Sequence, residues 1–389
     1  MRHRALTAAV SVFAAITIMA GCGGAGTSPF SKSAKKDVQE QGKTINIALV
    51  SCGAGIDDGS FVQDNYNGIC DFIKEHHGST VSPVIEPTGR TEEAVAQVKE
   101  IAPRYDVIVC TGYQFAGITE TAKANPDTGF ILVDAFPVDE AGNVVEADNI
   151  YAMMFREEES GFLAGMAAAL TTSTGKVAVV NGMAVEANIN YQYGFMSGVN
   201  YTNRNYGTNT EIVELAKYAG VTEDGKNVGG NYIGSFNDDL TGRNICKALI
   251  NEGCDVIFAA AGASCKGVLD IIKESEREVY MIASDTDMSR EGVVGSRNVI
   301  LTSAVKYMGK NDTRLLGEYL DGTFGGGNHI LGADTGSTGY INLPDRCRLS
   351  EDATEKIDKA YELMKSGAIV PASAVNGASP DSFTGIDAV

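Results

Sequence analysis

Short runs of apolar, often β-branched residues alternate with helical patterns along most of this chain. The first run covers residues 45–51, a loop of glycine and acidic residues follows, and residues 61–76 carry apolar side chains at helical spacing. Further strand-like runs lie at 106–110, 130–133, 176–180, 255–259, 279–283 and 299–302. Helical patterns lie at 92–101, 158–170, 192–204, 241–251 and 267–273. Such alternation predicts right-handed βαβ units and parallel sheets, which define the α/β class.

The alternation occurs twice along the chain. The segment 106–112 is similar to 255–262, and the glycine-rich segment 219–231 is a candidate insertion in the second half. We therefore expect two doubly wound parallel-sheet lobes joined by a hinge, with the carboxyl ends of their strands around one cleft. The expected domains are an N-terminal lobe of 45–150 with about 306–330, a C-terminal lobe of 151–305 with about 331–370, and a C-terminal tail of 371–389.

The start of the chain has a different character. Arg2 and Arg4 precede an apolar stretch over 5–19, which ends in Met-Ala-Gly-Cys at Cys22. This pattern predicts a bacterial lipoprotein signal peptide over 1–21, with a diacylglycerol on Cys22. An ordinary signal peptide with an incidental cysteine is the alternative. Residues 22–43 are small and polar, which is typical of a flexible tether. Two acyl chains give stable anchoring, so we expect a protein held at the extracytoplasmic face of the cell membrane.

The charge and cysteine content of the chain limit the kinds of partner that it can bind. Among 389 residues, 31 Lys and Arg stand against 50 Asp and Glu, a net charge of −19. This acidity argues against a nucleic-acid partner, which would need clustered basic residues. Beyond Cys22 the chain has seven cysteines, an odd number, so at least one thiol is free. There is no closely spaced Cys/His pattern for a metal and no cofactor motif, so we expect neither.

The loops that follow the expected strands share a set of polar and aromatic side chains. Carboxylates accept paired hydrogen bonds from hydroxyl groups, and aromatic faces stack on a flat heterocycle. We therefore expect a small, flat, polar ligand with sugar or amide groups. The candidate ligand-binding residues are Asp57, Asp58, Ser60, Phe61, Tyr66, Asp134, Phe236, Gly262, Asp285 and Lys306.

Catalytic patterns are weak. Ser303 and Lys306 have the S-x-x-K spacing of penicillin-recognising enzymes, but no S-D-N or K-T-G follows them. The four histidines are not near a candidate nucleophile in sequence, which makes a catalytic triad improbable. The sequence therefore indicates a binding protein rather than an enzyme.

Five blocks in a fixed order carry a family resemblance. They are DDGSF at 57–61, FREEESGFLAG at 155–165, GSFND at 234–238, DVIFAAAG at 255–262 and LTSAVK at 301–306. Together they resemble the basic membrane protein family of substrate-binding lipoproteins, over about residues 44–370. The resemblance implies a type I periplasmic-binding-protein fold, a purine nucleoside as ligand, and an ABC permease with its ATPase as partners of a monomeric receptor.

The resemblance also implies roles for individual residues. The pair Asp57 and Asp58 would face the base, and Tyr66 and Phe236 would stack on its two sides. Asp285 would hold the ribose hydroxyls. Gly262 would allow close backbone approach, Lys306 would reach the sugar or pair with a carboxylate, and Asp134 is a further candidate. Val62 stands where the family usually has Asn, and Ala283-Ser284 where Gly-Val is usual, which leaves the nucleobase open.

Other interpretations stay open at this stage. The acidic pair before Gly59 could cap the helix that follows, Tyr66 could be a core residue, and Phe236 could be an ordinary loop residue. We expect residues 157–159, three glutamates, to be a solvated helix start. For the whole protein, the alternatives are a receptor for a sugar or modified nucleobase, a nucleoside-processing enzyme, and a ligand-sensing lipoprotein with a signalling partner.

Overall fold

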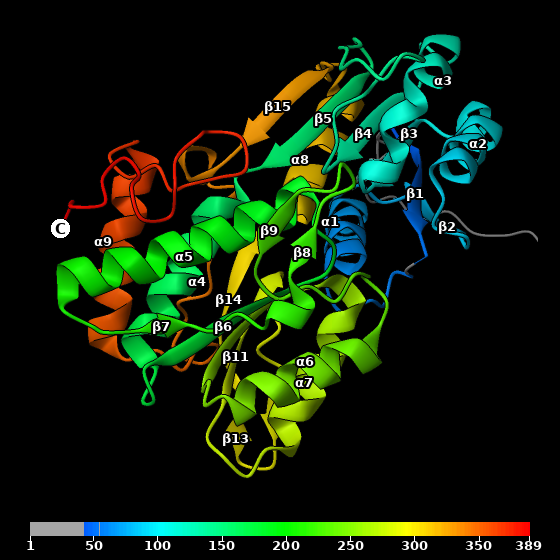
Figure 1. Cartoon of the computed structure of the whole chain (residues 1–389). Coiled ribbons are helices and arrows are strands. Elements are labelled where there is room, and N and C mark those ends of the chain that lie inside the picture. Colours follow the sequence, from blue (N-terminus) through cyan, green and yellow to red (C-terminus); the bar gives the residue numbers. More distant parts are fainter. Residues whose placement is uncertain (1–42, 54) are drawn as a thin grey trace, which may run out of the picture. The chain divides into compact units, whose positions relative to one another are not determined.

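The computed structural model describes residues 43–53 and 55–389. The expected signal peptide, the lipidation site Cys22 and nearly all of the tether lie outside the described residues. Two six-stranded sheets with helices on both faces dominate the described part of the chain (Figure 1). The predicted α/β class with two doubly wound parallel sheets is therefore confirmed.

The first sheet is parallel throughout, in the order β15-β5-β4-β3-β1-β2. Alternate residues of each strand face opposite sides. Thus Ile47 and Leu49 pack against helices α1 and α8, whereas Ala48 and Val50 pack on the side of α2. The strands are β1 (Asn46–Cys52), β2 (Thr80–Glu86), β3 (Val107–Thr111), β4 (Gly129–Val133), β5 (Ile150–Phe155) and β15 (Gly327–Leu331). The helices are α1 (Phe61–Glu75), α2 (Thr91–Ile101), α3 (Thr119–Ala124) and α8 (Met308–Asp321).

The second sheet has the order β16-β14-β11-β10-β6-β7 and is parallel except for β16, which runs antiparallel to β14. Its strands are β6 (Lys176–Asn181), β7 (Glu211–Ile212), β10 (Val256–Ala260), β11 (Tyr280–Asp285), β14 (Ile300–Lys306) and β16 (Thr338–Tyr340). Helices α4 (Glu157–Thr171), α5 (Glu186–Tyr206) and α9 (Glu351–Lys365) pack on one face. Helices α6 (Asp239–Asn251) and α7 (Cys265–Glu274) pack on the other.

Helices α4 and α5 approach each other unusually closely. A Cβ at Gly165 would overlap the carbonyl oxygen of Phe195, and a Cβ at Gly198 would overlap that of Phe162. Only glycine allows this approach of two helix backbones. The contact fixes the start of α5, which carries Asn188 and Tyr191 toward the carboxyl ends of the strands.

The chain passes between the two sheets three times, at Arg156, Tyr307 and Gly332. Strand β5 belongs to the first sheet as far as Phe155, and β15 as far as Leu331. The first lobe therefore extends a few residues beyond the boundaries expected at 150 and 330, because residues 150–155 form a strand hydrogen-bonded to β4 and β15.

Residues 371–389 pack along α5 of the second lobe. Asn200 donates from Nδ2 to the Pro380 carbonyl at 3.1 Å, and Asn205 donates to the Ile386 carbonyl at 2.8 Å. The ring of Phe383 meets that of Phe162 edge to face, with centroids 5.8 Å apart. The segment 219–231 forms a hairpin of β8 (Gly220–Val221) and β9 (Asn227–Gly229). A second hairpin pairs β12 (Val293–Val294) with β13 (Arg297–Asn298).

Candidate functional site

A cavity of about 450 Å³ lies where the carboxyl ends of the two sheets meet. We call it the cleft cavity. Its volume is in the range of small-molecule sites, and residues of both lobes form its walls. From the first lobe come Cys52, Asp58, Phe61, Val62, Thr111, Gly112, Tyr113, Gln114, Ala116, Asp134, Ala135, Phe136, Val144 and Met154. From the second come Val185, Glu186, Ala187, Asn188, Tyr191, Phe236, Ala260, Gly262, Ala263, Asp285 and Lys306.

Most of the residues expected at the ligand site lie on this cavity. Seven line it: Asp58, Phe61, Asp134, Phe236, Gly262, Asp285 and Lys306. Three do not. Asp57 is exposed outside the cavity, Ser60 is buried without lining it, and Tyr66 lies elsewhere on α1.

Tyr66 does not reach the position expected for a stacking ring. It packs against the core between α1 and the first sheet. Phe61, at the start of the same helix, does line the cavity. Five residues along an α-helix rotate a side chain by about 500°, which leaves it about 140° away from the starting direction. The two rings therefore cannot face the same cavity.

Asp58 caps helix α1 and lines the cavity as well. Its carboxylate accepts hydrogen bonds from the backbone N–H groups of Ser60 and Val62, both at 2.9 Å, and of Gln63 at 3.0 Å. Burial raises the pKa of Asp58, although these three donors favour its ionised form. Asp58 therefore caps α1, as one of the interpretations expected, and the hydrogen bonds of the cap fix the direction of its carboxylate.

Lys306, the last residue of β14, holds three carboxylates from both lobes around its ammonium group. It forms an ion pair with Asp134 of the first lobe, and its Nζ lies 3.3 Å from Glu157 Oε1 and 3.9 Å from Asp285 Oδ1. Only 3% of its side chain is exposed. Burial by itself would lower the pKa of Lys306, but the carboxylates outweigh it and hold the pKa above its ordinary value. Lys306 is therefore a permanent charge that joins the two lobes.

The three glutamates at 157–159 are not a solvated helix start. Glu157 is fully buried, and burial raises its pKa to about 7 against the opposing charge of Lys306. Glu159 is also buried and accepts from the Ala333 N–H and the Thr338 hydroxyl, each at 2.6 Å. The expectation was wrong because the start of α4 sits at the crossing between lobes, where these side chains bond to the other crossing segments.

Asp285, the last residue of β11, is held at three points. Its carboxylate accepts from the hydroxyls of Tyr191 at 3.0 Å, Ser60 at 3.2 Å and Ser284 at 3.3 Å. Ser60 belongs to the first lobe, so this bond also joins the lobes. Ser60 thus acts on the site through Asp285 rather than from the cavity wall.

Asp134 has the same position in the first sheet, directly after β4. Among the described residues, the two non-glycine residues with positive φ are Asp134 (60°) and Asp285 (67°). Such conformations cost free energy and concentrate at functional sites. One oxygen of Asp134 pairs with Lys306, whereas Oδ1 is buried without a hydrogen-bond partner. That oxygen is an unused hydrogen-bond acceptor on a residue that lines the cavity.

Aromatic rings form part of the cavity walls. The Phe236 ring lies directly on Gly182, where a Cβ would overlap it, and its Cβ is 3.4 Å from the Cβ position of Gly262. The sequence reasoning missed several lining residues: Tyr113, Gln114, Phe136, Asn188 and Tyr191. Tyr113 and Phe136 each follow a strand that was expected, so the rule used for the other candidates could have found them. Asn188 and Tyr191 lie inside a helix and carried no such signal.

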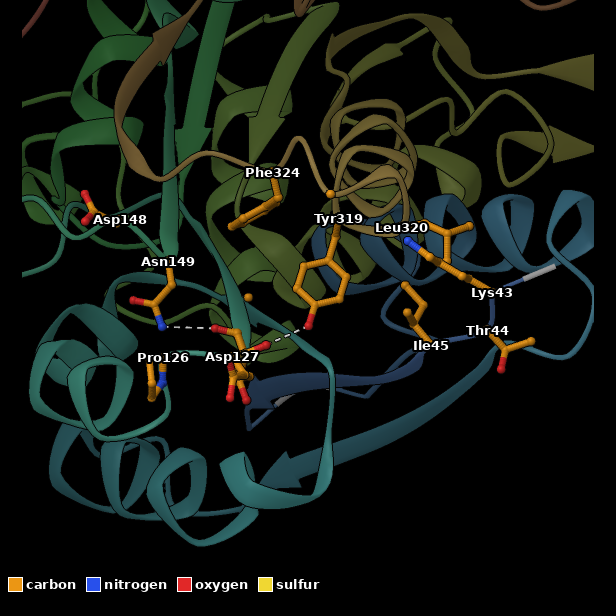
Figure 2. Close-up of a pocket in the computed structure, with 13 residues that line it drawn as sticks. Lys43, Thr44, Ile45, Pro126, Asp127, Asp148, Asn149, Tyr319, Leu320 and Phe324 are labelled. Atoms are coloured by element: carbon orange, nitrogen blue, oxygen red, sulfur yellow. Dashed lines mark hydrogen bonds between the residues drawn. The ribbon is translucent and has the colours of Figure 1, made fainter.

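A second hollow of about 710 Å³ lies at the other end of the first sheet, beside the amino-terminal ends of strands β1 and β4 (Figure 2). Polar groups there bond within the protein. The Tyr319 hydroxyl donates to the Asp127 carbonyl at 2.7 Å, and Asn149 Nδ2 donates to the Thr128 carbonyl at 3.0 Å. All of its lining residues come from the first lobe. The cleft cavity is the better candidate, because both lobes contribute a carboxylate to it and one oxygen of Asp134 has no hydrogen-bond partner.

The seven cysteines in the described part of the chain are free, and those residues contain no group of three His, Cys, Asp or Glu side chains that could hold a metal ion. Within residues 43–53 and 55–389, no helix is both long and apolar enough to span a bilayer.

The fold and the cavity define a two-lobed receptor that binds a small molecule between parallel sheets. More particularly, the chain belongs to the family of PnrA-like ABC transporter substrate-binding proteins, whose model matches residues 45–224 and 218–374. The resemblance to basic membrane proteins is thereby confirmed. Because this family consists of substrate-binding proteins, the protein is a transport component and not an enzyme.

Individual relatives agree with this assignment. The chain is 28% identical over 302 residues to basic membrane protein A1 of Borrelia garinii, with 77% of this chain and 80% of the relative covered. It is 26% identical over 350 residues to the ABC transporter nucleoside-binding protein BmpA of Lactococcus lactis, with 85% and 88% covered. The structure of an ABC transporter solute-binding protein from Aeropyrum pernix K1 matches with a TM-score of 0.70 at 20% identity, covering 86% and 94% of the chains. The expected periplasmic-binding-protein fold is confirmed.

Proposed function

We propose that this substrate-binding protein captures a purine nucleoside in the cleft cavity and delivers it to an ABC permease. The observation that carries the proposal is a pair of aspartates at the strand ends, both with a positive backbone φ. Asp134 has a free buried oxygen, and Asp285 is oriented by three hydroxyls. Two carboxylates can accept the paired hydroxyl hydrogen bonds that a ribose offers.

The rings near the cavity fit the other half of such a ligand. Phe61 and Phe236 lie on walls contributed by different lobes, and Phe136 adds a third ring. A flat base between aromatic faces gains about 0.5–1.5 kcal/mol beyond burial for each pair. The nucleoside-binding relative from Lactococcus lactis supports the same ligand class.

The charge balance argues for a nucleoside over a nucleotide. The one buried ammonium group on the described walls of the cavity, Lys306, is already surrounded by Asp134, Glu157 and Asp285. A phosphate would meet this net negative cluster without a free cation to pair with, which is costly in a buried site. We therefore expect 5′-monophosphates to be rejected.

Anchoring completes the proposal. A diacylglycerol on Cys22 would hold the receptor at the extracytoplasmic face of the membrane, beside its permease. Replacing Cys22 with Ser should release the protein from the membrane fraction and abolish labelling by radioactive palmitate. Retention of either property in the Cys22→Ser variant would contradict the lipid anchor.

Thermal-shift measurements on residues 23–389 test the ligand. A compound that binds the folded state raises the melting temperature by mass action. Guanosine, adenosine or inosine should do so in the wild type and in Asp57→Asn, whose side chain is exposed outside the cavity. The shift should be lost in Asp134→Asn and Asp285→Asn. A response to a sugar alone would refute the nucleoside as the ligand, but it would leave the function as a small-molecule receptor standing.

A further inference from the structure

Asn190 on α5 connects the C-terminal segment of the chain to the charged cluster around Lys306. It is buried, and it directly precedes Tyr191, whose hydroxyl donates to Asp285. The described residues that line the cleft cavity do not include Asn190. Any effect of Asn190 on a ligand must therefore pass through other residues.

Residues 371–376, which we call the tail turn, fix the orientation of the Asn190 amide. The backbone N–H of Ala374 donates to Asn190 Oδ1 at 2.8 Å. Because a backbone N–H can only donate, the amide must present its oxygen to the tail turn and its Nδ2 group to the other side. The tail turn is held on α5, since the Ala372 N–H donates to the buried Ser197 hydroxyl at 3.3 Å. In Figure 1 the red C-terminal segment lies beside α5.

On its other side Asn190 meets Glu157, the first residue of α4. Asn190 Nδ2 donates to Glu157 Oε2 at 3.4 Å, and Glu157 Oε1 lies 3.3 Å from Lys306 Nζ. A hydrogen bond donated to a carboxylate favours its ionised form. Burial raises the pKa of Glu157 to about 7, and the charge of Lys306 and the Asn190 donor both oppose that rise. Asn190 therefore helps to keep a negative charge next to Lys306.

The position of the Lys306 ammonium group matters for Asp285, one of the two carboxylates proposed to bind the ligand. Each carboxylate oxygen can accept two hydrogen bonds. Within the described residues, Asp285 Oδ2 accepts from two serine hydroxyls, and Oδ1 accepts from one donor, the Tyr191 hydroxyl. Lys306 Nζ is 3.9 Å from Oδ1, too far for a hydrogen bond. Oδ1 therefore keeps room for a further donor as long as Glu157 holds the ammonium group.

We infer that Asn190 is a positioning residue for the ligand site: oriented by the tail turn, it holds Glu157 on Lys306 and so keeps the ammonium group off Asp285. Without the Asn190 donor, Glu157 would take up a proton more easily, and neutral Glu157 would release Lys306 toward Asp285 Oδ1. A ligand hydroxyl would then compete with the ammonium group for that oxygen, and its affinity would fall. The effect on ligand affinity rests on the proposed function, whereas the effect on Glu157 does not.

The variants remove the donor and separate this role from a merely structural one. Asn190→Ala removes the amide, and Asn190→Leu removes it while filling a similar space, so that an effect shared by both is not due to a cavity. The matched control is Asn205→Ala. Asn205 also binds the C-terminal segment, at the Ile386 carbonyl, but it lies about 22 Å further along α5. Circular dichroism melting establishes that each protein is folded.

The first readout is the titration of Glu157 in the ligand-free protein, followed by carbon-13 NMR of labelled glutamate carboxyl groups. The Glu157 signal is the one that disappears in Glu157→Gln. Loss of the donor should raise its titration midpoint by about one to two pH units in both Asn190 variants and leave it unchanged in Asn205→Ala. Every Asn190 and Asn205 variant retains the other titratable groups that act on Glu157, namely Lys306, Asp134, Tyr191 and Glu158.

The second readout is the Kd for inosine, guanosine and adenosine by isothermal titration calorimetry at pH 8 and pH 6. At pH 8, Glu157 is mostly ionised in the wild type and mostly neutral in the Asn190 variants, so Kd should rise about threefold or more. At pH 6 it is mostly neutral in all of them, so Kd should agree within twofold. Asn205→Ala should match the wild type at both pH values.

A double-mutant cycle completes the test. Adding Asn190→Ala to Glu157→Gln should change Kd by less than twofold, because the residue through which Asn190 acts is already altered. An unchanged Glu157 midpoint, an equal loss of affinity at both pH values, or independent effects that multiply in the cycle would overturn the inference. Failure of the wild type to bind any nucleoside would refute the proposed ligand, and the Glu157 midpoint would still decide whether Asn190 acts on Glu157.

Discussion

Lys306 is the residue on which the electrostatics of the site depend. It is the shared partner of carboxylates on both lobes. Breaking a buried ion pair by removal of one partner costs about 3–5 kcal/mol, since the remaining charges stay buried. We expect Lys306→Met to lose stability of this order at pH 8.

The pH dependence of that loss has a definite sign. Burial already raises the pKa values of Asp134 and Glu157, and loss of the opposing ammonium charge would raise these two pKa values further above those of the unfolded chain. Such groups stabilise the fold least when ionised, so stability falls as the pH rises. The melting temperature of Lys306→Met should therefore lie closer to that of the wild type at pH 5 than at pH 8. Lys310→Met, at an exposed position, is the control and should change stability by less than about 0.5 kcal/mol.

At the same scale, the sequence allowed some site residues to be found and hid others. Asp134, Asp285 and Lys306 follow strands, and the carboxyl ends of parallel strands meet at one edge, so their grouping follows from topology. The direction of the Tyr66 side chain depends on its rotation around α1 relative to Phe61, and the polar residues in the loops after the strands give no information about that rotation. Tyr191 reaches the cavity because two helices pack at glycine contacts, a tertiary feature that no local pattern reports.

At the scale of elements, the α4–α5 contact is expected to be highly sensitive to added volume. In Gly198→Ala the new methyl group would overlap the Phe162 carbonyl, so the helices must separate. Overpacking of this kind costs about 1–3 kcal/mol. Urea denaturation should show this loss, and Gly317→Ala should show the reverse. Gly317 lies inside α8 with open space around it, where alanine gains roughly 0.5–1 kcal/mol.

Helix α8 also carries a buried carboxyl group without partners. Both oxygens of Asp312 lack hydrogen bonds, and burial, followed by the nearby charge of Asp64, raises its pKa well above the ordinary value. The unfolded chain releases this proton near pH 4, so the wild type should lose stability as the pH rises from about 4 to 7. The melting temperature of Asp312→Asn should change less with pH across this range than that of the wild type, and it should be higher than the wild-type value at pH 7. The exposed Asp321→Asn on the same helix should keep the slope of the wild type; an equal slope in both variants would contradict the assignment.

Elements with strong periodic patterns were predictable to within a few residues. The helical pattern at 61–76 corresponds to α1 (Phe61–Glu75), and that at 92–101 to α2 (Thr91–Ile101). Strand β15 was not expected, because it is a half-exposed edge strand without an apolar run. Edge strands owe their existence to pairing with a neighbour, so the sequence alone carries little signal for them.

At the scale of the whole molecule, the three crossings and the interlobe bonds describe a receptor whose lobes are held together from within the site. Asp134–Lys306 and Ser60–Asp285 both join the lobes at the cavity. A ligand that bonds to Asp134 and Asp285 would add to these links and favour the closed arrangement. The two-lobe organisation was predictable because the strand–helix pattern repeats. The exact hinge was not, since the crossings consist of single residues between regular elements.

The most direct test of the central claim is isothermal titration calorimetry on residues 23–389, with guanosine, inosine and adenosine in parallel with their 5′-monophosphates. We predict saturable one-to-one binding of at least one purine nucleoside, with its monophosphate bound at least about 100-fold more weakly because no free cation on the described cavity walls can pair with the phosphate. Binding of the nucleotide as tightly as the nucleoside, or no heat of binding with any of them, would contradict it.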